Sequence, residues 1–247
     1  MRPHTILPGQ PCSLPVSPGC NLEYQPSLLQ SLIGEERLHS LTARLTTETP
    51  TSPADIFFAD YKPDPFATLF HNSKDQSPDG KTASAPEFVI LCEQTSDDCA
   101  RTTSKIQCLT WGSDAAPEEL SQLRRDISVA VEHEMRTLRV DRMRSGAQYR
   151  GPRLENSLVY GRDPPAAAKS ALLCLGGARD VHFTANLERM TDLSLTLPTV
   201  HTYSVSMRHG DACILTQSLS HLWRHSVPRR ITAGVHGNIF LTFSSLR

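Results

Sequence analysis

The sequence has no run of 18 consecutive apolar residues, which is about the length that a membrane-spanning helix needs. Its first twenty residues contain five prolines, where a secretory signal peptide would need an uninterrupted apolar helix. None of its seven cysteines forms a Cys-x-x-Cys pair, which argues against a zinc ribbon and a disulfide scaffold. We therefore expect no membrane partner and a reducing compartment, nuclear or cytoplasmic. The sequence does not determine the oligomeric state.

Three common catalytic motifs are also missing. No Lys-Ser or Lys-Thr follows Gly176-Gly177, which excludes a phosphate-binding loop of the Walker type, and no Gly-x-Ser-x-Gly serine nucleophile is present. His221 and His225 have the spacing of a zinc-protease helix, but Leu222 stands where that motif requires glutamate. These absences argue against three hydrolase classes.

The charges are distributed unevenly over the 247 residues. Residues 1–135 contain 10 Lys and Arg against 19 Asp and Glu, a net of −9, whereas residues 136–247 contain 15 against 7, a net of +8. The densest basic run consists of Arg136, Arg139, Arg142, Arg144, Arg150 and Arg153. Such a run could attract the phosphates of a nucleic acid. The alternative is a solvated helix end and loop whose arginines pair with the acidic N-terminal half.

We divide the chain into an irregular Pro- and Ser-rich extension, residues 1–110, and a globular domain, residues 111–247. In the extension we expect an extended arm over residues 1–26 and a helix bearing leucines from Leu28 to Leu45. A linker, a loop and a strand are then expected at residues 45–55, 72–86 and 88–92.

The globular domain begins with the pattern of an amphipathic helix from Pro117 to Leu138, with one apolar stripe. Short apolar segments typical of strands follow at residues 171–175, 181–184, 193–197, 202–207, 212–216 and 239–243. Many strands within so few residues predict a mainly β fold, either a sandwich or a jelly roll.

Three segments near the end of the chain share a pattern with known proteins. They are Leu173-Cys174-Leu175-Gly176-Gly177-Ala178-Arg179-Asp180, Trp223-Arg224-His225-Ser226-Val227-Pro228 and Asn238-Ile239-Phe240-Leu241-Thr242-Phe243. Together they resemble the later strands of the AlkB-like iron(II)/2-oxoglutarate-dependent dioxygenases. The resemblance covers roughly residues 140–247 and implies a double-stranded β-helix, or jelly roll, with flanking α-helices.

The resemblance also implies an iron site. Enzymes of this kind bind iron through two histidines and one carboxylate, which leaves three positions for 2-oxoglutarate and oxygen. It implies His225 as the distal histidine and Asp163, 62 positions earlier, as the carboxylate. Gly161 stands where the proximal histidine is expected, and a glycine cannot bind a metal through a side chain. His182 and His236 are the candidates to replace it, but for each the favoured interpretation is a surface or hydrogen-bonded histidine.

The co-substrate positions of the family are also changed. Asn238 and Ser244 stand where the resemblance implies arginines that pair with 2-oxoglutarate. Asparagine can donate hydrogen bonds but carries no charge, so we expect weaker capture of the carboxylate. Tyr149, followed by Arg150 and Gly151, resembles the tyrosine that binds the same group, and Arg247 could supply a charge if the chain end folds back.

The resemblance implies oxidative demethylation of a nucleobase in DNA or RNA, or of a protein side chain, with iron(II) and 2-oxoglutarate. The alternative is a catalytically inactive jelly-roll relic that binds nucleic acid or protein, and the substitutions at Gly161, Asn238 and Ser244 motivate it. A third hypothesis is a mis-predicted exon around residues 149–165 that removed a His-x-Asp motif. Transcript sequencing would test it.

Overall fold

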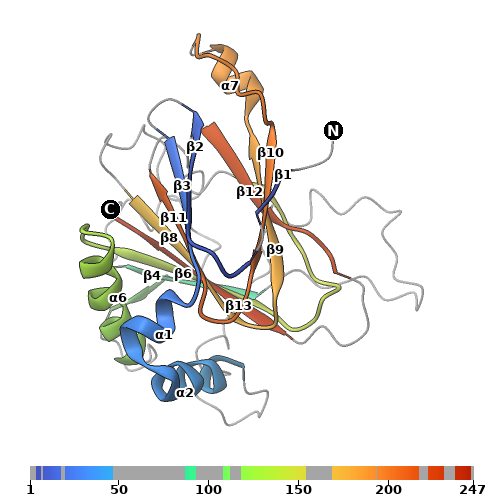
Figure 1. The fold of residues 1–247 in the computed structure, drawn as a ribbon. Helices are drawn as coiled ribbons and strands as arrows, with labels where there is room; N and C mark the ends of the chain where they lie inside the picture. The colour runs from blue at the N-terminus through green and yellow to red at the C-terminus, as the bar shows by residue number, and fades with distance from the viewer. Residues whose placement is uncertain are drawn as a thin grey trace.

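The structure is a computed structural model, and it describes residues 4–6, 8–17, 20–46, 87–92, 108–111, 118–153, 169–192, 194–216, 222–230 and 237–245. Two β-sheets form its core (Figure 1). Across the five-stranded sheet the order is β1 (His4–Ile6), β10 (Thr202–Met207), β9 (Arg179–Ala185), β12 (Trp223–Val227) and β7 (Arg150–Arg153). Across the eight-stranded sheet it is β2 (Cys12–Ser17), β3 (Cys20–Gln25), β11 (Ala212–Thr216), β8 (Lys169–Gly176), β13 (Asn238–Ser244), β6 (Thr137–Met143), β4 (Glu87–Cys92) and β5 (Cys108–Thr110).

Strands β6 to β13 have the topology of a jelly roll. Their antiparallel order is β6-β13-β8-β11 in one sheet and β7-β12-β9-β10 in the other. The chain therefore passes repeatedly from one sheet to the other, as an eight-stranded roll requires. The expected mainly β fold, a double-stranded β-helix with flanking helices, is confirmed.

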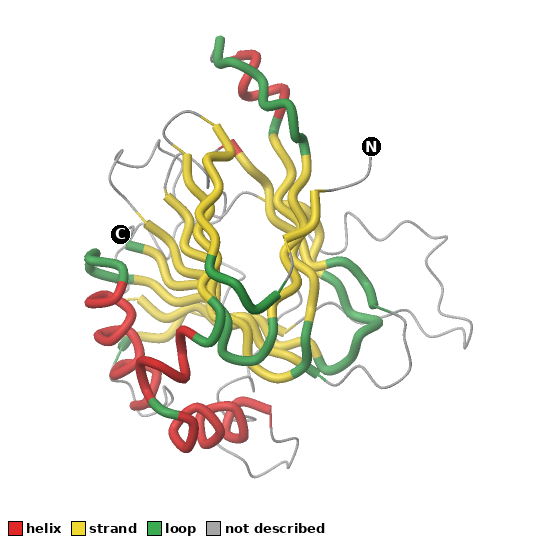
Figure 2. The backbone as a smooth tube through the Cα atoms, in the orientation of Figure 1, coloured by secondary structure: helices red, strands yellow, loops and turns green. Residues whose placement is uncertain are grey.

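Helices α1 (Leu28–Ile33), α2 (Glu35–Thr46) and α6 (Glu118–Ala130) cover the outer face of the eight-stranded sheet, and α7 (Leu187–Asp192) follows β9 at the far end (Figures 1 and 2). One hydrophobic cluster joins these three helices to the sheet, and a second fills the space between the two sheets. Every residue of β13 is buried, because this strand is covered on both faces. None of the described helices is long and apolar enough to cross a membrane.

The structure corrects two helix predictions. The single helix expected between Leu28 and Leu45 is two helices, because Gly34 adopts φ 77° between them. The helix expected to reach Leu138 ends at Ala130, and Glu132 takes a left-handed φ of 53° in the turn that follows. Leu138 instead lies in β6, where it still packs against the helices. An apolar residue at this position fits both the helical and the strand period, so the apolar pattern alone could not show where the helix ends.

Two further predictions were wrong. Residues 1–26 are not simply an arm, since β1 pairs with β10 and the β2–β3 pair extends the larger sheet beyond β11. Pro15 is compatible with this because β2 is an edge strand. Of the strand expected at residues 193–197, the described part is a loop, with Leu195 42% and Leu197 49% exposed. The expected strand at 88–92 is β4. The linker at 45–55, beyond the end of α2, and the loop at 72–86 lie outside the described residues.

A buried aspartate fixes the turn between β10 and β11, which joins the two sheets and is not a hairpin within one sheet. Asp211 accepts hydrogen bonds from the Tyr24 hydroxyl at 2.6 Å, from the Ser27 backbone N–H at 2.9 Å and from the Arg208 backbone N–H at 2.7 Å. Burial, together with the bond to Asp211, raises the pKa of Tyr24. The carboxylate thus joins the N-terminal strands to the jelly roll.

His209, in the same turn, makes the stability of the fold depend on pH. Its Nδ1 accepts the backbone N–H of Gly176 at 3.0 Å, which requires an unprotonated nitrogen. Burial, and then the neighbouring His39, lower the pKa of His209, while Asp211 and Glu35 oppose that shift. As the pH falls, the imidazole is protonated in the unfolded chain before it is protonated in the folded chain. The contribution of neutral His209 to the free energy of unfolding is therefore present above about pH 6.5 and is lost as the pH falls through the lowered pKa.

We therefore expect the free energy of unfolding to decrease between about pH 7 and pH 5, and to decrease less in His209→Gln. Urea denaturation at both pH values measures this difference. His133→Gln, at a half-buried histidine after α6, is the matched control and should keep the wild-type dependence. An unchanged dependence in His209→Gln would contradict the assignment.

Candidate functional site

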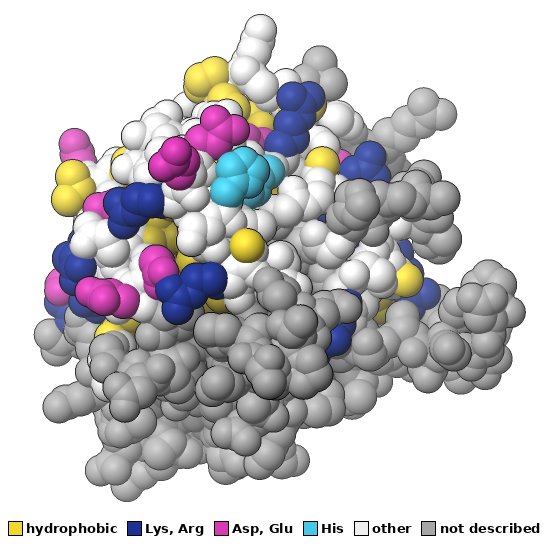
Figure 3. Space-filling view, turned by 90° about the horizontal axis from the view of Figure 1, so that it is seen from below, with side chains coloured by type: hydrophobic (Ala, Val, Ile, Leu, Met, Phe, Trp, Pro, Cys, Tyr) yellow, Lys and Arg dark blue, Asp and Glu magenta, His cyan; other side chains and the backbone are white. Residues whose placement is uncertain are grey.

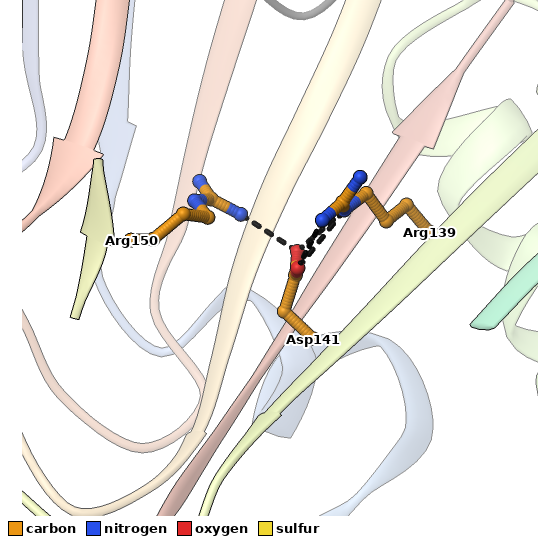
Figure 4. A network of polar contacts seen from close by, with 3 residues as sticks. All are labelled: Arg139, Asp141 and Arg150. Carbon is orange, nitrogen blue, oxygen red and sulfur yellow. Dashed lines mark hydrogen bonds and ion pairs between the residues drawn. The ribbon is translucent and has the colours of Figure 1, made fainter. Parts of the chain in front are cut away.

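Two arginines and one aspartate meet inside the jelly roll, and Figure 4 shows the guanidinium groups approaching the carboxylate from opposite sides. Arg139 and Asp141 lie on β6, and Arg150 comes from β7 on the opposing sheet. Nε of Arg139 lies 2.9 and 3.1 Å from the two oxygens of Asp141, and Nη2 lies 2.8 Å from Oδ1. Arg150 donates from Nη1 to Oδ2 at 2.8 Å. We call Arg139, Asp141 and Arg150 the inner charge cluster.

The alternation of β6 explains why charged side chains point inward. Leu138 and Val140 pack against the helices, so Arg139 and Asp141 must face the other sheet. Asp141 lies opposite Phe240 of β13, and the guanidinium of Arg150 lies 5.6 Å from the centre of the Phe240 ring. The sequence contained the signal for this cluster. Assigning Leu138 to a helix hid the strand period.

Burial corrects the interpretation of the arginine run as one basic surface. Arg139, Arg142 and Arg150 are only 8%, 4% and 5% exposed, so they do not form an exposed basic surface. Arg144 is exposed, Arg136 is half-buried beside Glu134, and the side chain of Arg153 lies outside the described part. On the face seen from below, acidic and basic side chains of the described residues are interspersed (Figure 3). Binding of nucleic acid itself stays a prediction.

The inner charge cluster contains more positive than negative charge, since two guanidinium groups share one carboxylate. Burying charge is costly unless it is paired and hydrogen-bonded. Asp141, 1% exposed, uses both oxygens to hold the arginines. Nε and Nη2 of Arg150 are also buried, but they have no hydrogen-bond partner among the described residues. The same holds for Oγ1 of Thr242, which lies opposite Arg139 on β13.

His225 points into the same interior from β12. It is 2% exposed and shares its inward face with Trp223 and Val227, and its ring lies 6.4 Å from that of Phe183. Val227 pairs with Arg150 across the β12–β7 ladder, so His225 and Arg150 lie on neighbouring strands and on one face of the five-stranded sheet. This inward position is what a metal ligand at the site requires. Metal binding by His225 stays a prediction.

The other predicted metal ligands are not brought to this place by the described residues. Asp163, Gly161 and His236 lie outside them. His182 is half-buried on β9 and alternates with Val181 and Phe183, which face the interior, so its side chain points away from His225. Within the described ranges, no group of three His, Cys, Asp or Glu side chains could hold a metal ion.

Asn238 begins β13, and its side chain lies beside the thiol of Cys174. Burial raises the pKa of Cys174 to about 12, and the interaction with Asn238 opposes that shift. Asn238 is 1% exposed, and both polar atoms of its amide lack a hydrogen-bond partner of normal geometry among the described residues. Tyr149 is half-buried, and the guanidinium of Arg229 lies 4.8 Å from the centre of its ring. Binding of 2-oxoglutarate by Tyr149 and Asn238 stays a prediction.

Arg179 has a structural role that the sequence did not predict. It is fully buried, and its Nη2 donates to the backbone carbonyls of Gln148 at 2.7 Å and Pro228 at 2.9 Å. Burial lowers the pKa of this guanidinium. Arg179 thereby joins the segment before β7 to the end of β12, and so fixes the two strands that carry Arg150 and His225.

An open cleft of about 450 Å³ lies at the ends of β6, β8 and β13. It is lined by Thr42, Thr46, Arg142, Met143, Arg144, Gly176, Gly177, Gly237, Asn238 and Ile239. The strand ends approach so closely that a Cβ on Gly237 would lie 2.9 Å from the carbonyl oxygen of Met143. The cleft therefore borders the strand end at which Asn238 enters the roll.

Among solved structures, the chain is similar to one described as "The structure of OsALKBH1". The TM-score is 0.49 and the sequence identity is 12%, and the match covers 90% of this chain and 96% of that chain. No protein-family model matches the sequence, and no relative was found among curated proteins. The assignment of the site therefore depends on the topology and on the residues described above.

Proposed function

We propose that this chain is an iron(II)/2-oxoglutarate-dependent oxygenase of the AlkB-like kind, with its reaction centre inside the jelly roll beside His225. The observation that carries the proposal is the inward, buried position of His225 on the strand next to Arg150, one of two guanidinium groups that share the carboxylate of Asp141. The sequence pattern around His225 implies an iron ligand, and the charge suits an acidic co-substrate.

The described residues fit the co-substrate better than the metal. Arg150, Thr242 and Asn238 offer buried polar atoms without partners in the described part of the chain, as an anionic ligand requires. For iron, His225 would be the histidine ligand, and Asp163 would be the carboxylate partner. When bound, iron(II) with 2-oxoglutarate supplies the oxidant that hydroxylates a methyl group, which then leaves as formaldehyde.

The chain's own contribution is to position the ligands and to exclude water. Arg179 fixes the strands that carry His225 and Arg150, and Phe183 and Phe240 form apolar surfaces beside these two side chains. Excluding water strengthens the attraction between the arginines and a carboxylate. The methyl group of the substrate would belong to a nucleobase or to a protein side chain. A nucleic-acid partner and a nuclear or cytoplasmic location remain predictions.

Anaerobic titration of the purified chain with iron(II) and 2-oxoglutarate tests the proposal. We expect the visible charge-transfer band of the iron complex, and then succinate once oxygen is admitted. Control titrations leave out iron(II) in one case and 2-oxoglutarate in the other. Absence of both the band and succinate would contradict the proposal.

That negative outcome would favour the second candidate function, an inactive jelly roll that binds nucleic acid or protein. Asp141 is the observation behind it, because a carboxylate of the chain itself already neutralises part of the interior charge. The glycine at position 161 and the substitutions at Asn238 and Ser244 point the same way.

A further inference from the structure

One edge of a buried guanidinium has no partner in the described part of the chain. In arginine, Nε and Nη2 form one edge of the planar group, and this edge can bind a carboxylate through two parallel hydrogen bonds. Arg139 uses this edge to hold Asp141. Arg150 holds Asp141 with Nη1 only, so its own Nε and Nη2 edge, although buried, has no acceptor among the described residues.

A second buried polar group with no partner among the described residues lies on the same inner surface. Thr242 is 2% exposed, faces inward two residues after Phe240, and lies directly opposite Arg139. Phe240 in turn lies beneath the guanidinium of Arg150. Leaving a buried hydroxyl and a buried guanidinium edge without acceptors costs free energy, and an anion between them would remove that cost.

We propose that the Nε and Nη2 edge of Arg150 and the hydroxyl of Thr242 form a subsite for one carboxylate of a small dicarboxylate, with Arg139 adding charge. If the proposed function is correct, this ligand is 2-oxoglutarate. Arginines of β6 and β7 then supply the positive charge that β13 lacks at Asn238 and Ser244. Asp141 is a positioning residue, because it holds both guanidinium groups in place.

Two conservative substitutions separate binding from folding. Arg150→Lys keeps a positive charge for Asp141 but removes the second edge. Thr242→Val keeps the shape of the side chain and removes a buried hydroxyl that has no partner in the described ranges. The unliganded Thr242→Val variant should therefore melt at the same or a higher temperature than the wild type, even though it binds the ligand less well. A purely structural threonine would not give this combination.

The experiment is isothermal titration of the full chain with 2-oxoglutarate and with succinate, each with Mn²⁺ and with a metal chelator. We expect each substitution to raise the Kd by about tenfold or more, the loss expected for hydrogen bonds to a charged group. Arg125→Lys on the exposed face of α6 and Thr202→Val on β10 are matched controls and should bind as the wild type does. Dimethyl succinate, which has no charge, should not bind, and inorganic phosphate tests whether the subsite accepts any anion.

The outcomes distinguish this inference from the proposed function. Dicarboxylate binding that depends on Arg150 and Thr242, but without an iron band or succinate formation, would support the subsite and contradict the oxygenase. Turnover that neither substitution changes would contradict the subsite alone. The subsite would be overturned if the wild type bound neither 2-oxoglutarate nor succinate, whether with Mn²⁺ or with the chelator. It would also be overturned if inorganic phosphate bound with the same Kd as the dicarboxylates.

Discussion

Replacing Asp141 with asparagine is expected to lower the free energy of unfolding by about 3–5 kcal/mol, the typical cost of removing one partner from a buried ion pair. Asparagine has nearly the same shape, so the loss would come from charge. Two buried guanidinium groups would lose the carboxylate that accepts from both of them. An amide in its place would also turn a donor toward an arginine. Urea denaturation at neutral pH measures the change.

The matched control for this experiment is Asp192→Asn, an exposed residue at the end of α7. Its stability should stay within about 0.5 kcal/mol of the wild type. A loss of less than about 1 kcal/mol in Asp141→Asn would mean that the inner charge cluster is far better solvated than its burial indicates.

Replacing His225 with glutamine is expected to weaken iron(II) binding by more than about 100-fold. Substituting even a residue that only hydrogen-bonds to a metal ligand typically lowers the metal affinity by about 10- to 100-fold. Glutamine keeps a polar side chain at this buried position beside Phe183. The anaerobic charge-transfer band should disappear, and succinate formation should fall with it. Binding of iron(II) measured by a competing chelator gives the affinity directly.

His182→Gln is the matched control, because His182 lies on the adjacent strand β9 but on its outer face. It should keep the band and the affinity of the wild type. If His225→Gln also kept them, iron would not be bound by this imidazole and the proposed reaction centre would be wrong. Circular dichroism of both variants would exclude a loss of fold as the cause.

Most strands of the jelly roll could be predicted from the sequence. The strands β8 and β13 are covered on both faces, so their sequences are nearly continuous apolar runs that predict strands. The predictions that failed depended on partners distant in sequence. Strands β1 and β3 form near the start of the chain because β10 and β11 offer edges to pair with. The described residues around Leu195 form no strand, although their local pattern is apolar.

The candidate site divides in the same way. The pattern around His225 was readable because the segment resembles a known one, and the structure places that imidazole inward as a ligand requires. The inner charge cluster was not predicted, because extending the helix to Leu138 hid the alternation of β6 that turns Arg139 and Asp141 inward. Thr242 gave no signal of its own, since a hydroxyl matters only when its partners are known.

The amino-acid sequence by itself determined the β-rich composition of the second half, the inward-facing alternation of its strands, and the substitutions at Gly161, Asn238 and Ser244. Only the tertiary structure decided that Arg139 and Arg150, eleven positions apart, approach one carboxylate from opposite sheets. The physical reason is that strand alternation fixes which face a side chain occupies, whereas the packing of two sheets fixes what that face meets.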